Sequence, residues 1–226
     1  MKALGIILAG GNNSRMGSLS DKRAIAAMPI AGSYRAIDFT LSNMTNSHIQ
    51  TVAVLSQYNA RSLNEHLNSS KWWNFGRKQG GLFLFTPTVT ADNSWWYRGT
   101  ADAMWQNIDF LKRRHEPYVV IANGDCVYKV DFNDVLDFHI QKGSNITVVC
   151  AKVPDGDDVN RYGVVKMDND AQITDFEEKP MMAHSNIVST GIYVIRRRTL
   201  IELLEQCNRE GRYNFVTDIL IRYRNV

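Results

Sequence analysis

Long apolar runs are missing from this 226-residue sequence, since none approaches the roughly 20 consecutive apolar residues that a membrane helix needs. The opening residues 1–9 are too short, and reach glycine too soon, for a signal peptide, so we expect a buried strand there. Cysteine is also scarce. Its three positions show no metal-type spacing and are expected to be reduced core thiols, which suits a cytoplasmic protein: Cys126, Cys150 and Cys207.

An excess of charge of one sign is lacking too. Lysine and arginine number 26 against 23 acidic residues, giving a net charge of +3. This is too mild and too dispersed for a nucleic-acid footprint, although the pI near 8.7 leaves a weak case open. The apolar fraction of 44% is enough for one domain core, with or without a small subdomain.

Strands and helices alternate almost from the first residue. Apolar and alternating runs predict strands at 3–9, 51–55, 82–85, 118–122, 146–152, 163–167, 172–176 and 190–195. Helical spacing predicts helices at 34–46, 59–68, 100–114, 132–142, 199–207 and 215–222, with Thr100 as a candidate N-cap. This order predicts an α/β fold: a Rossmann-like, doubly wound, mixed but mainly parallel sheet. Ligands of such sheets bind beyond the carboxyl ends of the strands, so residues 10–11, 124–125 and 176–180 should lie near one another.

The first chemistry-bearing segment is the glycine-rich stretch at residues 8–17. Paired glycines after a strand free backbone N–H groups to approach phosphate, and Arg15 adds a cation able to bind it bidentately. The stretch matches neither the P-loop nor the dinucleotide fingerprint. A plain turn at the strand end suits the same residues equally well, so both interpretations stay open.

Three further segments are suggestive, each with an alternative. Asp125, at the end of an apolar strand, suits Mg²⁺, but such an aspartate is as often a cap or turn residue. The charged residues at 176–180 suit an anionic ligand or a solvated turn. The aromatics at 95–97, before a glycine and a helix N-terminus, could stack on a base or sugar or belong to the core.

Together, these segments resemble the sugar-1-phosphate nucleotidyltransferases and, within them, the glucose-1-phosphate adenylyltransferase family. The matching stretches cover essentially the whole chain: residues 8–17, 34–39, 41–43, 57–58, 96–103, 106–107, 124–131, 161–165, 176–180, 189–193 and 215–218. The resemblance implies a cytoplasmic, oligomeric enzyme of glycogen biosynthesis. Its substrates would be ATP and glucose 1-phosphate, and its products ADP-glucose and pyrophosphate. A dehydrogenase is disfavoured because residues 27–37 contain no acidic residue.

The resemblance also implies roles for individual residues. Nucleotide binding falls to Leu8, Gly10, Gly11, Tyr97, Gly99 and Thr100. Catalytic roles fall to Arg15, Lys22, Asp125 and Lys179, and binding of the sugar phosphate to Glu178, Lys179 and Ser189. Mg²⁺ would be held by Asp125 and Asp218. No covalent nucleophile is needed, because phosphoryl chemistry of this kind rests on positioning and charge neutralisation.

The sequence departs from the family pattern at three places. Ile25 stands where the family carries a catalytic lysine and Ala26 where it carries a proline; Cys126 replaces a histidine, and residues 216–217 replace a Gly-Lys pair. A cation about 4 Å from a phosphate contributes roughly 4 kcal/mol, and its loss would slow the reaction about a thousandfold.

We therefore hypothesise an accessory, regulatory-type subunit that assembles with a catalytic subunit. Lys22 or Arg23 could compensate in part. The alternative is a fully active subunit, which the presence of Arg15, Asp125, Lys179 and Asp218 favours. We assign residues 1–226 to one nucleotidyltransferase domain. The C-terminal β-helix of the family is expected to be absent from this chain, because no hexapeptide-like repeat occurs before Val226.

Overall fold

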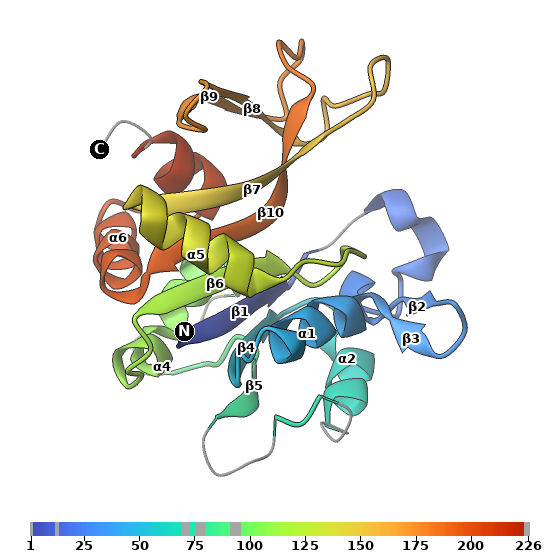
Figure 1. Cartoon of the computed structure of the whole chain (residues 1–226). Coiled ribbons are helices and arrows are strands. Elements are labelled where there is room, and N and C mark those ends of the chain that lie inside the picture. Colours follow the sequence, from blue (N-terminus) through green and yellow to red (C-terminus); the bar gives the residue numbers. More distant parts are fainter. Residues whose placement is uncertain (1, 12–13, 69–72, 76–79, 91–95, 224–226) are drawn as a thin grey trace.

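A computed structural model describes residues 2–11, 14–68, 73–75, 80–90 and 96–223, without the side chains of residues 14 and 15. Its main feature is an eight-stranded sheet in the order β5-β4-β1-β6-β10-β8-β9, with β7 also paired to β10 (Figure 1). The strands are β1 (Ala3–Ala9), β4 (Thr51–Ser56), β5 (Gly81–Phe85), β6 (Tyr118–Asn123), β7 (Ile146–Lys152), β8 (Gly163–Met167), β9 (Ile173–Glu178) and β10 (Ile187–Arg196).

Four neighbouring strands, β5, β4, β1 and β6, run parallel. The long strand β10 then runs antiparallel to β6, β7 and β8. The strands β1, β4 and β6 are almost continuously apolar because helices cover both faces of the sheet. The predicted α/β fold with a mixed, mainly parallel sheet is therefore confirmed.

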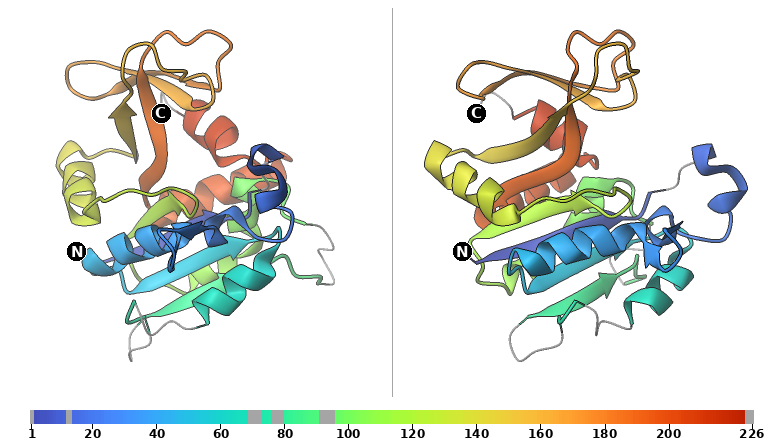
Figure 2. Two further views of the ribbon diagram at one scale, coloured as in Figure 1. Left: turned by 90° about the vertical axis from the view of Figure 1, so that its right-hand side faces the viewer. Right: turned by 45° about the vertical axis from the view of Figure 1, so that its right-hand side comes forward.

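The helices form a layer on each face of the sheet (Figures 1 and 2). One layer contains α1 (Ala36–Asn46), α2 (Ala60–Leu67) and α5 (Phe132–Lys142), and the other contains α3 (Thr100–Gln106), α4 (Ile108–Lys112) and α6 (Arg197–Arg209). Strand β1 serves both layers because successive side chains point to opposite faces: Ile7 packs in the first core and Ile6 in the second. A π-helical segment, η4 (Val216–Ile221), follows α6.

Several boundaries differ from the sequence prediction, most clearly in two of the helices. The helix expected at 100–114 breaks at Asn107, whose side-chain amide donates to the Ala103 carbonyl at 2.9 Å and so competes with the helical hydrogen bonds. Its N-cap position is Gly99 and not Thr100. The helix expected from residue 34 begins at Ala36, because a small ribbon of β2 (Pro29–Ile30) and β3 (Tyr34–Arg35) precedes it.

At one end of the sheet, β8, β9 and the N-terminal part of β10 form a projecting lobe (Figure 2). A small apolar cluster supports it, built on Val159, Val164 and Val188. All three cysteines are free thiols. Within the described ranges, every helix is too short or too polar to cross a membrane.

Candidate functional site

The carboxyl ends of β1 and β6 meet at one edge of the sheet. The N–H of Gly124 donates to the Leu8 carbonyl at 2.9 Å, which joins the segment after β6 to the end of β1. Gly10 lies beside β4, since a Cβ there would lie 3.5 Å from the Cβ of Gln57. The glycine loop and the Gly124-Asp125 pair are therefore neighbours, as the sequence predicted.

The glycine loop leaves open space beside it. Gly11 is exposed, and a Cβ built there would meet nothing within 4 Å. The backbone of Arg15 lies in a short helix, η1 (Ser14–Leu19), but its side chain is outside the described part of the structure. Lys22 is exposed in the following loop, whose backbone is tied to Asn59 through the carbonyls of Ser20 and Asp21. Among the described residues, none obstructs the approach of an anion to Gly11.

A side-chain clamp at Gln57 fixes the aromatic segment against the glycine loop. The Gln57 carbonyl oxygen accepts the N–H of Tyr97 at 2.6 Å, and its amide donates to the Tyr97 carbonyl at 3.3 Å. Tyr97 itself is buried, and its hydroxyl accepts a hydrogen bond from Asn107, while burial raises its pKa. The exposed aromatic surface belongs instead to Trp96, whose ring stacks on Tyr58 at 6.2 Å between centroids. Gln57 belongs to the family-like stretch at residues 57–58, but the sequence alone indicates no role for it.

The segment after Tyr97 is anchored to the end of the chain. A side chain at Gly99 would overlap the carbonyl group of Tyr213, so this close approach requires glycine. That carbonyl accepts the N–H groups of Ala101 and Asp102, at 2.8 and 3.1 Å, and thereby caps α3. Thr100 adds a second tie, because its hydroxyl accepts the Phe215 N–H at 2.9 Å. The first turn of α3 therefore depends on residues more than 100 positions away.

A buried carboxylate reinforces this anchor. Asp102 accepts hydrogen bonds from the backbone and the guanidinium of Arg98, at 2.9 and 2.8 Å, and from the amide of Gln106. The Arg98 guanidinium also lies 3.8 Å over the Tyr213 ring and donates to its hydroxyl. Sequence reasoning had given neither Arg98 nor Tyr213 a role, since their contact is visible only in three dimensions.

The segment carrying Ile25 packs beside Gly124. Ile25 begins a short helix, η2 (Ile25–Ala27), and a Cβ on Gly124 would lie 3.4 Å from the Cβ of Ala26. The half-buried Ile25 side chain carries no charge, so this turn supplies no cation next to the Gly124-Asp125 corner. At that corner Asp125 is exposed, and the neighbouring Cys126 has its pKa raised to about 11, mainly by burial and further by the Asp125 charge. Cys126 is therefore a neutral thiol at physiological pH.

The residues expected to bind the sugar phosphate lie on two strands: Ser189 is in β10, and Glu178 ends β9. Ser189 and Tyr193 hydrogen-bond through their hydroxyls at 3.3 Å, and burial raises the pKa of Tyr193 to about 12, with a further contribution from the Glu178 charge. A bulge in β10 brings Gly191 against Asn123 at the end of β6, so tightly that a Cβ on Gly191 would overlap the Asn123 amide. Ser189 is thus connected, through β10, to the same edge of the sheet as Asp125.

Lys179 has an unusual backbone. Its φ of +48° lies in the left-handed region, where a residue with a Cβ is disfavoured, and its N–H donates to the Tyr162 carbonyl at 3.0 Å. The ammonium forms an ion pair with Glu178 at 3.0 Å and is 61% exposed. The hydrogen bond to Tyr162 helps to hold Lys179 in this conformation.

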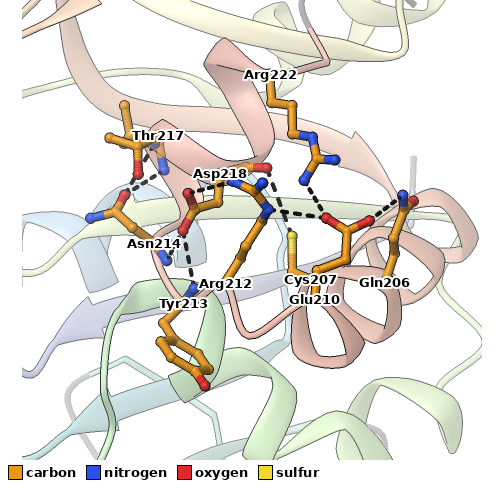
Figure 3. A network of polar contacts seen from close by, with 10 residues as sticks. Gln206, Cys207, Glu210, Arg212, Tyr213, Asn214, Thr217, Asp218 and Arg222 are labelled. Carbon is orange, nitrogen blue, oxygen red and sulfur yellow. Dashed lines mark hydrogen bonds and ion pairs between the residues drawn. The ribbon is translucent and has the colours of Figure 1, made fainter.

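Asp218 lies in the network of Figure 3, at the start of η4. Its Oδ2 accepts the backbone N–H groups of Tyr213 and Asn214, at 3.0 and 2.9 Å, and its Oδ1 lies 3.9 Å from the Arg212 guanidinium. Glu210 pairs with both Arg212 and Arg222 in the same network. Asp218 therefore holds the turn that precedes η4 in this structure, whereas the side chain of Asn214 accepts the first N–H groups of that helix.

These contacts bear on whether Mg²⁺ fits. Among the described residues, no group of three or more His, Cys, Asp or Glu side chains could hold a metal ion. Magnesium needs only one or two carboxylates when substrate phosphates supply the rest, so the exposed Asp125 fits that role. Asp218 fits less well, because Arg212 and two backbone N–H groups already use its carboxylate. Its role as a metal ligand stays a prediction.

Comparison with known proteins agrees with this geometry. The family model described as "Nucleotidyl transferase" matches residues 4–225. The chain belongs to this family. The glucose-1-phosphate adenylyltransferase of Pseudothermotoga lettingae is 45% identical over 221 residues, which are 97% of this chain and 52% of the relative.

Two further relatives carry the same name. The Thermotoga neapolitana protein is 40% identical over 95% of this chain and 51% of its own length, and the Bacillus cereus protein is 38% identical over 97% and 58%. The chain thus spans about half the length of the curated relatives it matches.

Proposed function

We propose that this nucleotidyl transferase chain serves the reaction of a glucose-1-phosphate adenylyltransferase, in which ATP and glucose 1-phosphate give ADP-glucose and pyrophosphate. The observation that carries the proposal is the meeting of three segments at one sheet edge: the glycine loop, the Gly124-Asp125 corner and the Ser189 bulge of β10. Relatives that bear the adenylyltransferase name match the chain over nearly its whole length.

The chemistry follows from the products. An oxygen of the sugar phosphate bonds to the α-phosphorus of ATP, and the bond from that phosphorus to the pyrophosphate oxygen breaks. Both reactants are anionic, so the chain must neutralise charge and hold the two phosphates together. The open space beside Gly11 suits the nucleotide phosphates, and the exposed Lys179 ammonium suits the sugar phosphate. Bound Mg²⁺, held through Asp125, would supply further charge neutralisation between the phosphates.

Turnover by this chain alone is proposed to be weak. Ile25 stands beside the Gly124-Asp125 corner, where an ammonium would lie close to transferring phosphates. The missing cation is worth roughly 4 kcal/mol, or about a thousandfold in rate. The chain would then act as an accessory subunit whose oligomer includes a catalytic partner. A fully active subunit is the second candidate, favoured by the presence of Arg15, Asp125, Lys179 and Asp218 in the sequence.

Substrate dependence tests the reaction itself. Pyrophosphate release should require both ATP and glucose 1-phosphate and should fall when UTP replaces ATP, using the full-length protein alone and with a catalytic subunit. The binding of ATP and of glucose 1-phosphate, measured by calorimetry, should persist even if turnover is weak.

A lysine substitution tests the sugar-phosphate site. Lys179→Gln should weaken glucose 1-phosphate binding at least about tenfold, whereas Lys166→Gln, which changes an exposed lysine on β8, should not. Absence of binding of either substrate to the folded protein would refute the proposal.

A further inference from the structure

A hollow lies at the edge of the sheet opposite the candidate site. It has a volume of about 350 Å³ and is lined by His115, Pro117, Tyr118, Arg196, Arg197 and Arg198. Tyr118 begins β6 and Arg196 ends β10, and these two residues face each other in the antiparallel register. Because β6 starts here and ends at Asn123, the hollow is separated from the Gly124-Asp125 corner by the full length of the strand (Figure 1). It is therefore distinct from the site described above.

Among the described residues, the arginines of this hollow form no ion pair with a carboxylate. Arg197 is engaged in packing, since its guanidinium donates to the carbonyls of Glu116 and Leu111 at 2.9 and 3.1 Å. Arg196 and Arg198 are exposed, and within the described ranges neither is among the residues that form ion pairs. Glu116, which lies between His115 and Pro117 in the sequence, is used elsewhere: it accepts the His115 N–H at 3.1 Å and a hydrogen bond from the Thr51 side chain, which lower its pKa against the effect of burial.

The position of these arginines opposes the field of α6. Arg196 is the N-cap residue of this 13-residue helix and makes no side-chain cap, and the first turn contains no acidic residue. Cations at the positive end of a helix are unfavourable, whereas an anion there is favourable. The Arg197 N–H donates to the Pro117 carbonyl, which leaves the N–H groups of Arg198 and Thr199 to other partners. A bound anion would offset all of these positive charges together.

Buried His139 packs against Tyr118, which lines this hollow. It is 1% exposed, its ring lies edge-on to Tyr118, and its Nδ1 is hydrogen-bonded to Thr147 at 2.8 Å. Among the described residues, its Nε2 has no hydrogen-bond partner. Burial lowers the pKa of His139, and the charge of Arg196 lowers it further.

We propose that this hollow, between the start of β6 and the N-terminus of α6, is a binding site for the phosphate group of a small anion. Two guanidinium groups and backbone N–H groups are the donors that phosphate takes in proteins, and arginine can bind it bidentately. The volume lies at the lower end of the range for small-molecule sites, with Tyr118 and Pro117 as an apolar wall. Inorganic phosphate and a phosphomonoester share this chemistry.

Amide NMR of the full-length protein tests the site. Titration with inorganic phosphate, and separately with glycerol 3-phosphate, should shift the amide signals of Arg198 and Thr199. Arg196→Gln combined with Arg198→Gln should raise the dissociation constant at this site at least about tenfold, whereas Arg209→Gln, at the other end of α6, should leave it unchanged. Tighter binding of the ester would identify an organic phosphate as the ligand class, and equal binding the free ion.

Stability provides a second measurement. Without phosphate, the double variant should melt at the same temperature as the unmodified protein or higher, because like charges at a helix N-terminus are removed. Phosphate should then raise the melting temperature of the unmodified protein more than that of the variant. Phosphate bound at the glycine loop would shift Gly10 and Gly11 equally in both proteins, so it is distinguishable. Unshifted Arg198 and Thr199 signals, or equal affinity in the double variant, would overturn the proposal.

Discussion

The buried carboxylate of Asp102 is expected to be the main anchor of the segment that connects the candidate nucleotide site to the end of the chain. Its side chain is 1% exposed and accepts four hydrogen bonds, three from Arg98 and one from Gln106. Replacing it with alanine removes the acceptor of all four. Arg98 would also lose the partner that holds it over Tyr213.

The expected cost follows from these contacts. Breaking a buried ion pair by removing one partner costs about 3–5 kcal/mol. The Arg98 side chain is 35% exposed, so water can solvate part of the charge left behind, and we expect the lower end of that range. A loss of about 3 kcal/mol in a chain of this size corresponds to a fall of roughly 6–12 °C in melting temperature.

Urea and thermal denaturation of Asp102→Ala measure this loss directly. Asp109→Ala is the matched control, because Asp109 also lies in the first turn of a short helix but is exposed. Its loss should stay below about 1 kcal/mol. If the two variants are equally stable, Asp102 does not anchor this segment and the reasoning is wrong.

Three further outcomes are expected. Gly99→Ala should lower the free energy of unfolding by about 1–3 kcal/mol in urea titrations, since the added methyl overlaps the Tyr213 carbonyl group, and an unchanged midpoint would show that this approach is not required. Cys126, with its pKa raised to about 11, should react with iodoacetamide at pH 8 at least about tenfold more slowly than free cysteine; equal rates by mass spectrometry would contradict the raised pKa. Asp218→Ala should cost about 1–2 kcal/mol even in EDTA, because its carboxylate accepts two backbone N–H groups of the turn before η4, whereas a side chain that serves only as a metal ligand would show no loss without metal.

The central sheet could be predicted because its signal is local. Continuous apolar runs in β1 and β6 require burial on both faces, and the alternation with helices then favours the parallel arrangement. The glycine loop and Gly124 were correctly expected to meet, because parallel strands bring their carboxyl ends to one edge.

The parts that could not be predicted depend on contacts between distant residues. Asn107 fits a helical pattern, yet its amide binds the Ala103 carbonyl and the Tyr97 hydroxyl, which ends α3. The carbonyl of Tyr213 caps α3 from more than 100 residues away, and nothing in the spacing of either segment indicates this. Asp218 was predicted as a metal ligand, but its hydrogen bonds to the Tyr213 and Asn214 N–H groups depend on the local path of the chain.

Synthesis of ADP-glucose tests whether the isoleucine at position 25 limits turnover by this chain. The full-length protein is assayed with ATP, glucose 1-phosphate and Mg²⁺, unmodified and as Ile25→Lys, with Leu19→Lys as an exposed control from the same loop region. We expect weak turnover by the unmodified chain and by Leu19→Lys. In Ile25→Lys the turnover rate should rise at least about tenfold, and up to about a thousandfold. Turnover of roughly 1–1,000 per second by the unmodified chain, or no gain from Ile25→Lys, would contradict this expectation.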